Sequence, residues 1–207
     1  AKIAQLWCSQ PSRILDIGCG DGVIGRFLMN IYPAVHATFV DFSDPMLNAA
    51  RDQLNDAKRA VLVKADITTS AWLKDVRGEA QFDIVVSGFA IHHKPDARKK
   101  GLYAEVLDLL APGGVFLNLD HVASLTSSGE ELFSDFFIDN LHRFHVKEAP
   151  NKTRQEVAET YYNRLDKKEN NPAPVDVQCE WLRQVGFLDV DCFFKLFELA
   201  LFGGRKP

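Results

Sequence analysis

Short apolar blocks alternate with longer amphipathic blocks along the first 120 residues of the chain. The short blocks predict buried strands at residues 13–17, 37–41, 60–64, 82–87 and 115–119. Apolar positions at helical spacing predict helices that begin at Val23, at an N-cap on Asp44 and at Asp96, the last ending before Pro112. Strands that alternate with helices in this way predict a mostly parallel sheet with helices on both faces.

The C-terminal part of the chain breaks this alternation. A helix is expected to end at Gly186, and residues 187–202 then form a long apolar stretch without room for a crossover helix. Two consecutive antiparallel strands explain this stretch best. We therefore expect a seven-stranded sheet with a hairpin at one edge.

Residues 124–174 are expected to form a helical insertion within a single domain of residues 1–207. Residues 130–144 carry apolar side chains around more of a helix than one core-facing stripe requires. Two interpretations stay open. The helix is either wedged between two layers, or it is a lid whose aromatic surface lines a ligand pocket together with Tyr161 and Tyr162.

Composition narrows the classes of function. The chain has 24 Lys and Arg against 28 Asp and Glu, a net charge of −4. It therefore lacks the excess of positive charge that is typical of nucleic-acid-binding proteins. No apolar run approaches the roughly 20 residues that span a bilayer, so we expect no membrane association. The four cysteines show no metal-ligand or disulfide spacing, and the N-terminus does not resemble a signal peptide. A cytoplasmic location is the expectation from these features.

A glycine-rich turn follows the first strand, where open parallel sheets bind their ligands. Residues 20–25 formally match the dinucleotide motif G-x-G-x-x-G. A pyrophosphate in this turn would face the carboxylates of Asp16 and Asp21, and like charges at short range are costly. A ligand with an ammonium and a sulfonium group, such as S-adenosylmethionine, would instead be stabilised there.

Two further acidic residues follow the next strands. Asp41 ends the second strand, 21 residues after Gly20, where a carboxylate can accept hydrogen bonds from both ribose hydroxyls of either cofactor. Asp66 lies two residues after the third strand and could meet an adenine amino group, with Ile67 against the ring. The set indicates a nucleoside site without phosphate.

The motifs that carry this pattern are ILDIGCGDG at 14–22, VD at 40–41, ADI at 65–67, FDIVV at 82–86 and LAPGG at 110–114. In this order they resemble the class I S-adenosylmethionine-dependent methyltransferases, and the region after the fourth strand looks most like the small-molecule branch. The resemblance implies a Rossmann-like three-layer αβα sandwich with seven strands, mostly parallel, and an antiparallel C-terminal hairpin.

By the same resemblance, Asp16 and Gly18 take the methionine end of the cofactor, and Gly20 in the Cys19–Gly20 turn allows close backbone approach. Asp41 takes the ribose. The expected adenine contacts are Asp66 and Ile67, with Phe42 on the other face, and the expected backbone contacts around the cofactor are Ser87 and Gly88. The cofactor S-adenosylmethionine would leave as S-adenosylhomocysteine.

Candidate catalytic residues follow the fourth and fifth strands. One of His92 and His93 could act as a base or orient the acceptor, although both could simply hold their loop. His121 faces the same edge and could contact the acceptor. No carboxylate partner set accompanies Asp120, so we expect no metal.

The leading hypothesis is a methyltransferase that acts on a small or medium organic acceptor. Two alternatives stay open, an NAD-type oxidoreductase and a cofactor-binding protein without transferase activity. The sequence does not indicate the acceptor, the methylated atom or the oligomeric state.

Overall fold

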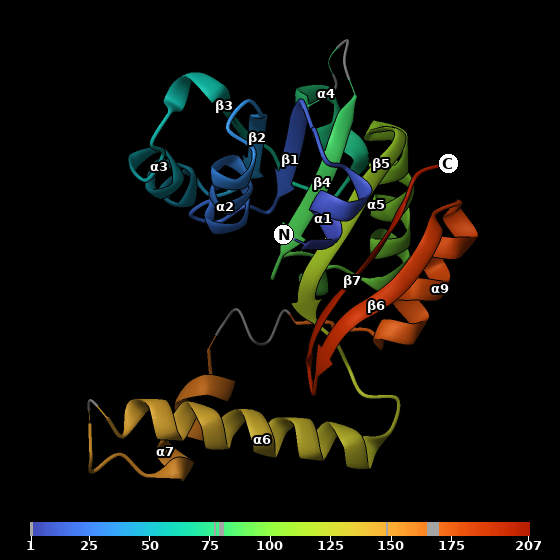
Figure 1. Ribbon diagram of the computed structural model, residues 1–207. Helices are drawn as coiled ribbons and strands as arrows, with labels where there is room; N and C mark the ends of the chain where they lie inside the picture. The colour runs from blue at the N-terminus through green and yellow to red at the C-terminus, as the bar shows by residue number, and fades with distance from the viewer. Residues whose placement is uncertain (1, 77, 79–80, 148, 165–169) are drawn as a thin grey trace.

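The computed structural model describes residues 2–76, 78, 81–147, 149–164 and 170–207. At its centre lies a seven-stranded sheet with strand order β3-β2-β1-β4-β5-β7-β6 (Figure 1). The strands are β1 (Arg13–Ile17), β2 (His36–Asp41), β3 (Ala60–Lys64), β4 (Phe82–Gly88), β5 (Leu110–His121), β6 (Leu188–Leu196) and β7 (Leu199–Arg205). The first five strands pair in parallel, and β7 pairs antiparallel with both β5 and β6. The predicted sheet and its C-terminal hairpin are confirmed.

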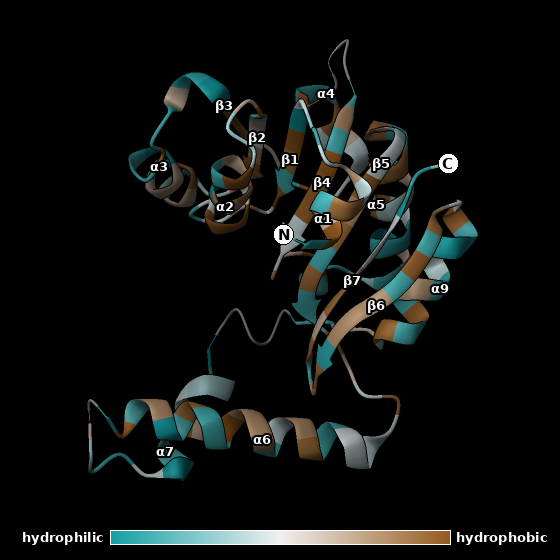
Figure 2. Ribbon diagram, viewed as in Figure 1, coloured by the Kyte–Doolittle hydropathy of each residue, from teal (hydrophilic) through white to brown (hydrophobic). Residues whose placement is uncertain are grey.

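Helices cover both faces of the sheet and build two separate apolar cores. On one face, α1 (Lys2–Trp7), α2 (Val23–Ile31) and α3 (Asp44–Asp52) contribute to the core around Phe39. On the other face, α4 (Leu73–Val76), α5 (Asp96–Leu109) and α9 (Val175–Val185) contribute to the core around Tyr103 and Phe116. Figure 2 shows apolar segments running through β1, β4 and β5 between these helices. The three-layer αβα arrangement is confirmed.

Parallel pairing brings the carboxyl ends of three strands to one edge of the sheet. Ile17 at the end of β1 lies opposite Val40 in β2 and Ser87 in β4. The loops that follow these strands therefore start side by side. This is the edge at which open α/β sheets bind ligands.

Two boundaries differ from the sequence-based expectations. The N-cap of α3 is Ser43 rather than Asp44, because Ser43 is the extended residue whose hydroxyl accepts from the backbone N–H of Met46. The fifth strand begins at Leu110 rather than at residue 115, because Leu110 pairs with Phe82 before the register shifts around the Pro-Gly-Gly segment.

The insertion consists of α6 (Ser127–His145) and α7 (Arg154–Tyr162), which lie together beyond the carboxyl end of β5 (Figure 1). Its two ends meet, because Ala123 pairs with Pro174 in a β-bridge. The ring of Phe136 on α6 stacks on Phe197 in the β6–β7 turn, with centroids 3.9 Å apart. The insertion therefore rests on the C-terminal hairpin through aromatic contacts, and the sheet edge beside it stays accessible.

Candidate functional site

The turn after β1 has a backbone conformation that glycine favours. Gly18 and Gly20 have φ angles of 62° and 54°, in the left-handed region. The backbone N–H of Cys19 donates to the carbonyl of Val40, which ties the turn to β2. A Cβ on Gly18 would lie 2.2 Å from the Cβ of Ala90, whereas a Cβ on Gly20 would meet nothing within 4 Å. The absence of a side chain at Gly18 thus allows Ala90 to pack closely against it, whereas Gly20 faces open space.

Asp16 places a buried carboxylate beneath this turn. Its side chain is 1% exposed, and its Oδ2 accepts a 2.8 Å hydrogen bond from the backbone N–H of Gly25 at the start of α2. Among the described residues, no group donates to its Oδ1. Burial raises the pKa of this carboxyl from 3.8 to about 7, and the charges of Asp41 and Asp21 add to the shift. A buried acceptor without a donor is costly, so this oxygen is suited to a cationic ligand.

Asp41 is oriented by two backbone donors at the end of β2. Its Oδ2 accepts from the N–H of Gly20, and its Oδ1 accepts from the N–H of Ser43, each at 2.9 Å. A carboxylate has about four acceptor positions, so each oxygen of Asp41 keeps one for a further donor. The arrangement suits a pair of neighbouring hydroxyl groups.

A cavity of about 630 Å³ lies over this edge of the sheet and includes both carboxylates. Nine of the residues predicted as site residues line it: Asp16, Gly18, Cys19, Gly20, Asp41, Phe42, Ile67, Gly88 and His93. Phe42 is 68% exposed and forms part of its rim. The structure therefore brings together most of the predicted cofactor site.

Two predicted contacts lie outside the lining of this cavity. Ser87 is buried, and its hydroxyl donates to the carbonyl of Ile17, so it joins β4 to β1. Asp66 is exposed, and one of its oxygens accepts from both the N–H and the hydroxyl of Thr68. These hydrogen bonds hold the pKa of Asp66 below its usual value.

The three candidate catalytic histidines occupy different environments. His92 is buried, with its Nδ1 2.5 Å from Oδ1 of Asp120, and its backbone N–H donates to Oδ2 of the same residue. His93 packs on the ring of His92 and lines the large cavity. His121 lies edge-on to His92, with centroids 5.2 Å apart, and faces a second cavity.

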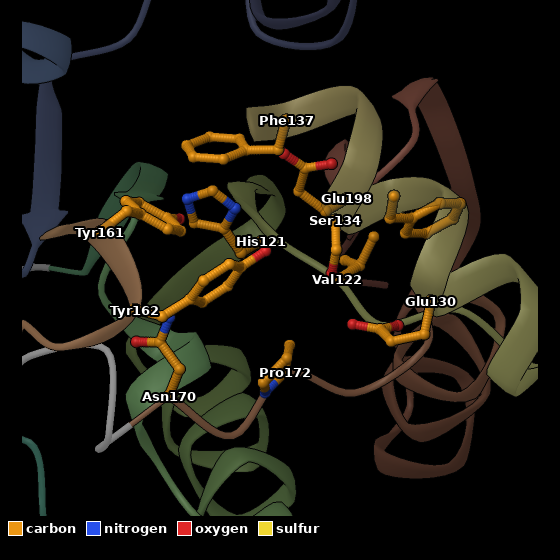
Figure 3. Close-up of a pocket in the computed structure, with 11 residues that line it drawn as sticks. His121, Val122, Glu130, Ser134, Phe137, Tyr161, Tyr162, Asn170, Pro172 and Glu198 are labelled. Carbon is orange, nitrogen blue, oxygen red and sulfur yellow. The ribbon is translucent and has the colours of Figure 1, made fainter. Parts of the chain in front are cut away.

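This second cavity, of about 190 Å³, lies between the end of β5, the insertion and the β6–β7 turn. Its lining comprises His121, Val122, Glu130, Phe133, Ser134, Phe137, Tyr161, Tyr162, Asn170, Pro172 and Glu198. In Figure 3, His121 lies among Phe137, Tyr161 and Tyr162. The carboxylate of Glu198 lies beside Phe137, whereas Glu130 lies apart from this group.

Phe89 links the lining of the large cavity to that of the second cavity. It lines the large cavity, and its ring lies 5.3 Å from the ring of His121, which lines the small one. Phe89 has a φ of 54°, a backbone conformation that is uncommon for a bulky residue. The rings of Phe89 and His121 therefore bring the linings of the two cavities into contact.

Asn171 connects the insertion to the loop beside the large cavity. Its backbone N–H donates to the carbonyl of His92, and its amide donates to the carbonyl of Lys94. The carbonyl of Asn171 accepts from the buried ammonium group of Lys99 on α5, which also pairs with Asp96. The end of the insertion is thereby fixed to residues 92–94.

A family model described as a methyltransferase domain matches residues 14–114, from β1 into β5. Its matched region contains the glycine turn, both carboxylates and the loop after β4. The family match, the curated relatives and the structural neighbours all support a class I S-adenosylmethionine-dependent methyltransferase.

Named relatives and solved structures agree with this family. The chain is 32% identical over 124 residues to a demethylmenaquinone methyltransferase of Leptospira interrogans, covering 60% of this chain and 48% of that protein. It is 26% identical over 205 residues to a carboxy-S-adenosyl-L-methionine synthase of Aeromonas hydrophila, covering 96% and 76%. An O-methyltransferase family protein from Burkholderia thailandensis has the same fold, with a TM-score of 0.69 at 14% identity over 96% of this chain and 52% of that one. The chain thus spans about half the length of the first and third of these proteins.

The sequence did not indicate several of the residues that line the two cavities. Val23, Ile24 and Met46 line the large cavity from the first turns of α2 and α3. Val23 and Met46 are about half exposed, and apolar residues directly after a glycine turn or an N-cap were the available signal. Glu198 of the second cavity gave no such signal, because it comes from the distant β6–β7 turn.

The described residues form neither a metal site nor a membrane-spanning helix. No group of three or more His, Cys, Asp or Glu side chains there is arranged to hold a metal ion. None of the helices in the described part of the chain is both long and apolar enough to cross a bilayer.

Proposed function

We propose that the protein transfers a methyl group from S-adenosylmethionine to a small or medium organic acceptor. The observation that carries this proposal is Oδ1 of Asp16, a buried carboxylate oxygen without a donor among the described residues, in the wall of a large cavity. A positively charged group is the complement of such an oxygen.

The residues of the large cavity fit this cofactor. Asp16 would bind its ammonium group, Asp41 would accept from its ribose hydroxyls, and Ile67 and Phe42 would contact its adenine. The backbone of the glycine turn would lie against the cofactor at Gly18, Cys19 and Gly20. When bound, the cofactor supplies a methyl group on a positively charged sulfur, which is already a good leaving group.

An NAD-type cofactor fits the same cavity less well. Asp16, Asp21 and Asp41 all line the region of the glycine turn, where a pyrophosphate would lie. Of the described lining residues only Lys94 is a Lys or Arg, and its ammonium group donates to Thr68. The charges around the turn therefore favour a cation over a dinucleotide.

The residues where the linings of the two cavities meet would position the acceptor. Holding an acceptor atom in line with the methyl group can supply much of the acceleration, and a base is needed only if the acceptor loses a proton. His121 and Phe89 lie where the acceptor would reach the cofactor cavity, and the imidazole of His121 could take that proton. His92, held by Asp120, would keep the loop in place.

In this proposal α6 and α7 form a lid over the acceptor within a single domain, and the expected location is the cytoplasm. Four free cysteines are consistent with a reducing compartment. No metal is part of the proposed mechanism.

Calorimetric titration tests the cofactor. We expect saturable binding of S-adenosylhomocysteine and no saturable binding of NAD⁺ under the same conditions. The reverse result would contradict the proposal and favour the oxidoreductase. Conversion of S-adenosylmethionine to S-adenosylhomocysteine in a screen of candidate acceptors would separate a transferase from a protein that only binds the cofactor.

A further inference from the structure

We infer that the second cavity binds an acceptor with a single aromatic ring and a positively charged amino group, and that it disfavours carboxylates. This inference rests on the proposed function and adds the chemical class of the acceptor. Three features of the cavity carry it: aromatic walls, two acidic residues and limited volume.

The walls of the cavity present aromatic rings from three parts of the chain. Phe133 and Phe137 come from α6, Tyr161 and Tyr162 from α7, and His121 from the end of β5. The rings of Phe137 and Tyr161 already pack together, with centroids 4.5 Å apart. Such walls bind a planar ring by stacking and edge contacts, and their faces attract cations.

The charges in the lining have one sign. Glu130 comes from the first turn of α6 and Glu198 from the β6–β7 turn, and the described lining contains neither Lys nor Arg. The ammonium group of Lys195 lies 5.5 Å from the ring of Phe133, but Lys195 is not part of the lining. Two carboxylates beside aromatic faces favour an ammonium group and repel a carboxylate.

The remaining polar groups are compatible with a phenol or an amine. His121 and the hydroxyls of Tyr161, Tyr162 and Ser134 can each take part in hydrogen bonds with such groups. The cavity volume of about 190 Å³ lies below the roughly 300–1,000 Å³ of sites for drug-sized ligands. A single ring with a short side chain therefore fits better than a fused ring system.

The position of the cavity agrees with a role in binding the acceptor. His121 lines it and contacts Phe89, which lines the large cavity. A ring bound among Phe137, Tyr161 and His121 would lie next to this contact. Its substituent would then point either toward the cofactor cavity or toward the glutamates.

Three probes with the same phenol ring test this inference. Tyramine carries an ammonium group, 4-ethylphenol carries no charge, and 4-hydroxyphenylacetate carries a carboxylate. Each is titrated calorimetrically into protein saturated with S-adenosylhomocysteine. We expect tyramine to bind about tenfold or more tightly than 4-hydroxyphenylacetate, with 4-ethylphenol between them. Equal binding of the three, tighter binding of the carboxylate, or no saturable binding of tyramine would overturn the inference.

Variants assign the charge preference to the cavity. Glu130→Gln and Glu198→Gln should each reduce the preference for tyramine over 4-hydroxyphenylacetate about three- to tenfold. In Glu130→Gln the amide oxygen can still accept from the N–H of Ser124, as the carboxylate does. Glu131→Gln is the matched control, because Glu131 is an exposed neighbour on α6 outside the lining. A preference that is unchanged in both cavity variants would count against the assignment.

The titration of S-adenosylhomocysteine keeps this inference separate from the proposed function. If S-adenosylhomocysteine binds but the probes follow the opposite order of charge, only the acceptor class is wrong. If S-adenosylhomocysteine does not bind, the proposed function fails first.

Discussion

The two cavities are built in different ways. The large cavity is made from the ends of β1 and β2, with backbone N–H groups that hold Asp16 and Asp41 in fixed orientations. The small cavity is made from side chains of the insertion and of the β6–β7 turn. Backbone hydrogen bonds thus fix the carboxylates of the proposed cofactor site, whereas side chains from separate elements form the proposed acceptor site.

We expect the largest effects on stability and cofactor binding from substitutions in the turn after β1. Gly18→Ala should prevent stable folding, because it adds left-handed strain of roughly 1–2 kcal/mol and a clash of its Cβ with Ala90. Gly20→Ala adds only the strain, since nothing lies near its Cβ, but this Cβ projects toward the cavity. Thermal unfolding and calorimetry should show loss of stability in the first variant and loss of S-adenosylhomocysteine binding in a folded second one. Equal stability of the two would contradict the packing role of Gly18.

Asp16→Asn should weaken S-adenosylhomocysteine binding about 100-fold or more and yet stabilise the free protein. The carboxylate loses its charge, but the amide oxygen can still accept from Gly25. The free energy of unfolding at pH 8 should rise on the order of 1–3 kcal/mol, because a buried charge without a donor is removed. Chemical denaturation and calorimetry measure the two effects, and a variant that is destabilised at pH 8 would contradict this account.

Because of the Asp16 carboxyl group, we expect both the stability of the protein and its affinity for a cationic ligand to depend on pH. The pKa of this carboxyl group is raised by burial to about 7 in the folded protein, so the folded state holds this proton more tightly than the unfolded state does. Its contribution to stability is therefore fully present below about pH 4 and is lost as the pH rises through about 7. Affinity for a cationic ligand should fall as the pH drops below 7. Asp16→Asn should remove this part of both pH profiles.

Asp41→Ala should weaken S-adenosylhomocysteine binding by about 1–3 kcal/mol, because two charge-assisted hydrogen bonds are lost. The variant also frees the N–H groups of Gly20 and Ser43, which shape the turn. Asp52→Ala, an exposed position at the end of α3, is the matched control. Unchanged affinity in Asp41→Ala would remove this residue from the cofactor site.

The smallest effect on cofactor affinity is expected at His121. His121→Ala should lower kcat about 100-fold if the acceptor must lose a proton, with little change in S-adenosylhomocysteine binding. His93→Ala should also lower turnover more than cofactor affinity, although His93 lines the large cavity. His36→Ala, at the exposed start of β2, controls for removal of an imidazole. A kcat equal to that of the unaltered protein would leave His121 without a catalytic role.

This difference between the cavities also explains what the sequence could predict. The sequence could predict Asp16, Gly18, Gly20 and Asp41 because each lies at or just after the carboxyl end of a strand, and parallel pairing brings these ends together. The limits of β1 and β3 agree with the predicted ones for the same reason. Local sequence patterns were sufficient to predict structural features that depend on residues close together in the sequence.

Contacts between distant segments were not predictable in this way. Glu198 reaches the second cavity only because Phe197, in the same turn, stacks on Phe136 of α6. The early start of β5 depends on pairing between Leu110 and Phe82, which a local apolar pattern does not report. The aromatic residues of α6 left two interpretations open, a wedged helix and a lid that lines a pocket with Tyr161 and Tyr162. A cavity is present there, but the sequence did not indicate that the β6–β7 turn would contribute to it.

The clamp around Asn171 has a mechanical consequence. Its hydrogen bonds join the last turn of the insertion to the peptide groups on either side of His93, while Lys99 holds it to α5. Any tilt of α6 and α7 that pulls on Asn171 therefore also pulls on the wall of the nucleoside cavity. If a ligand in the second cavity moves Asn171, it will also change the affinity of the large cavity for its ligand, and by thermodynamic reciprocity the two affinities will change by one common factor.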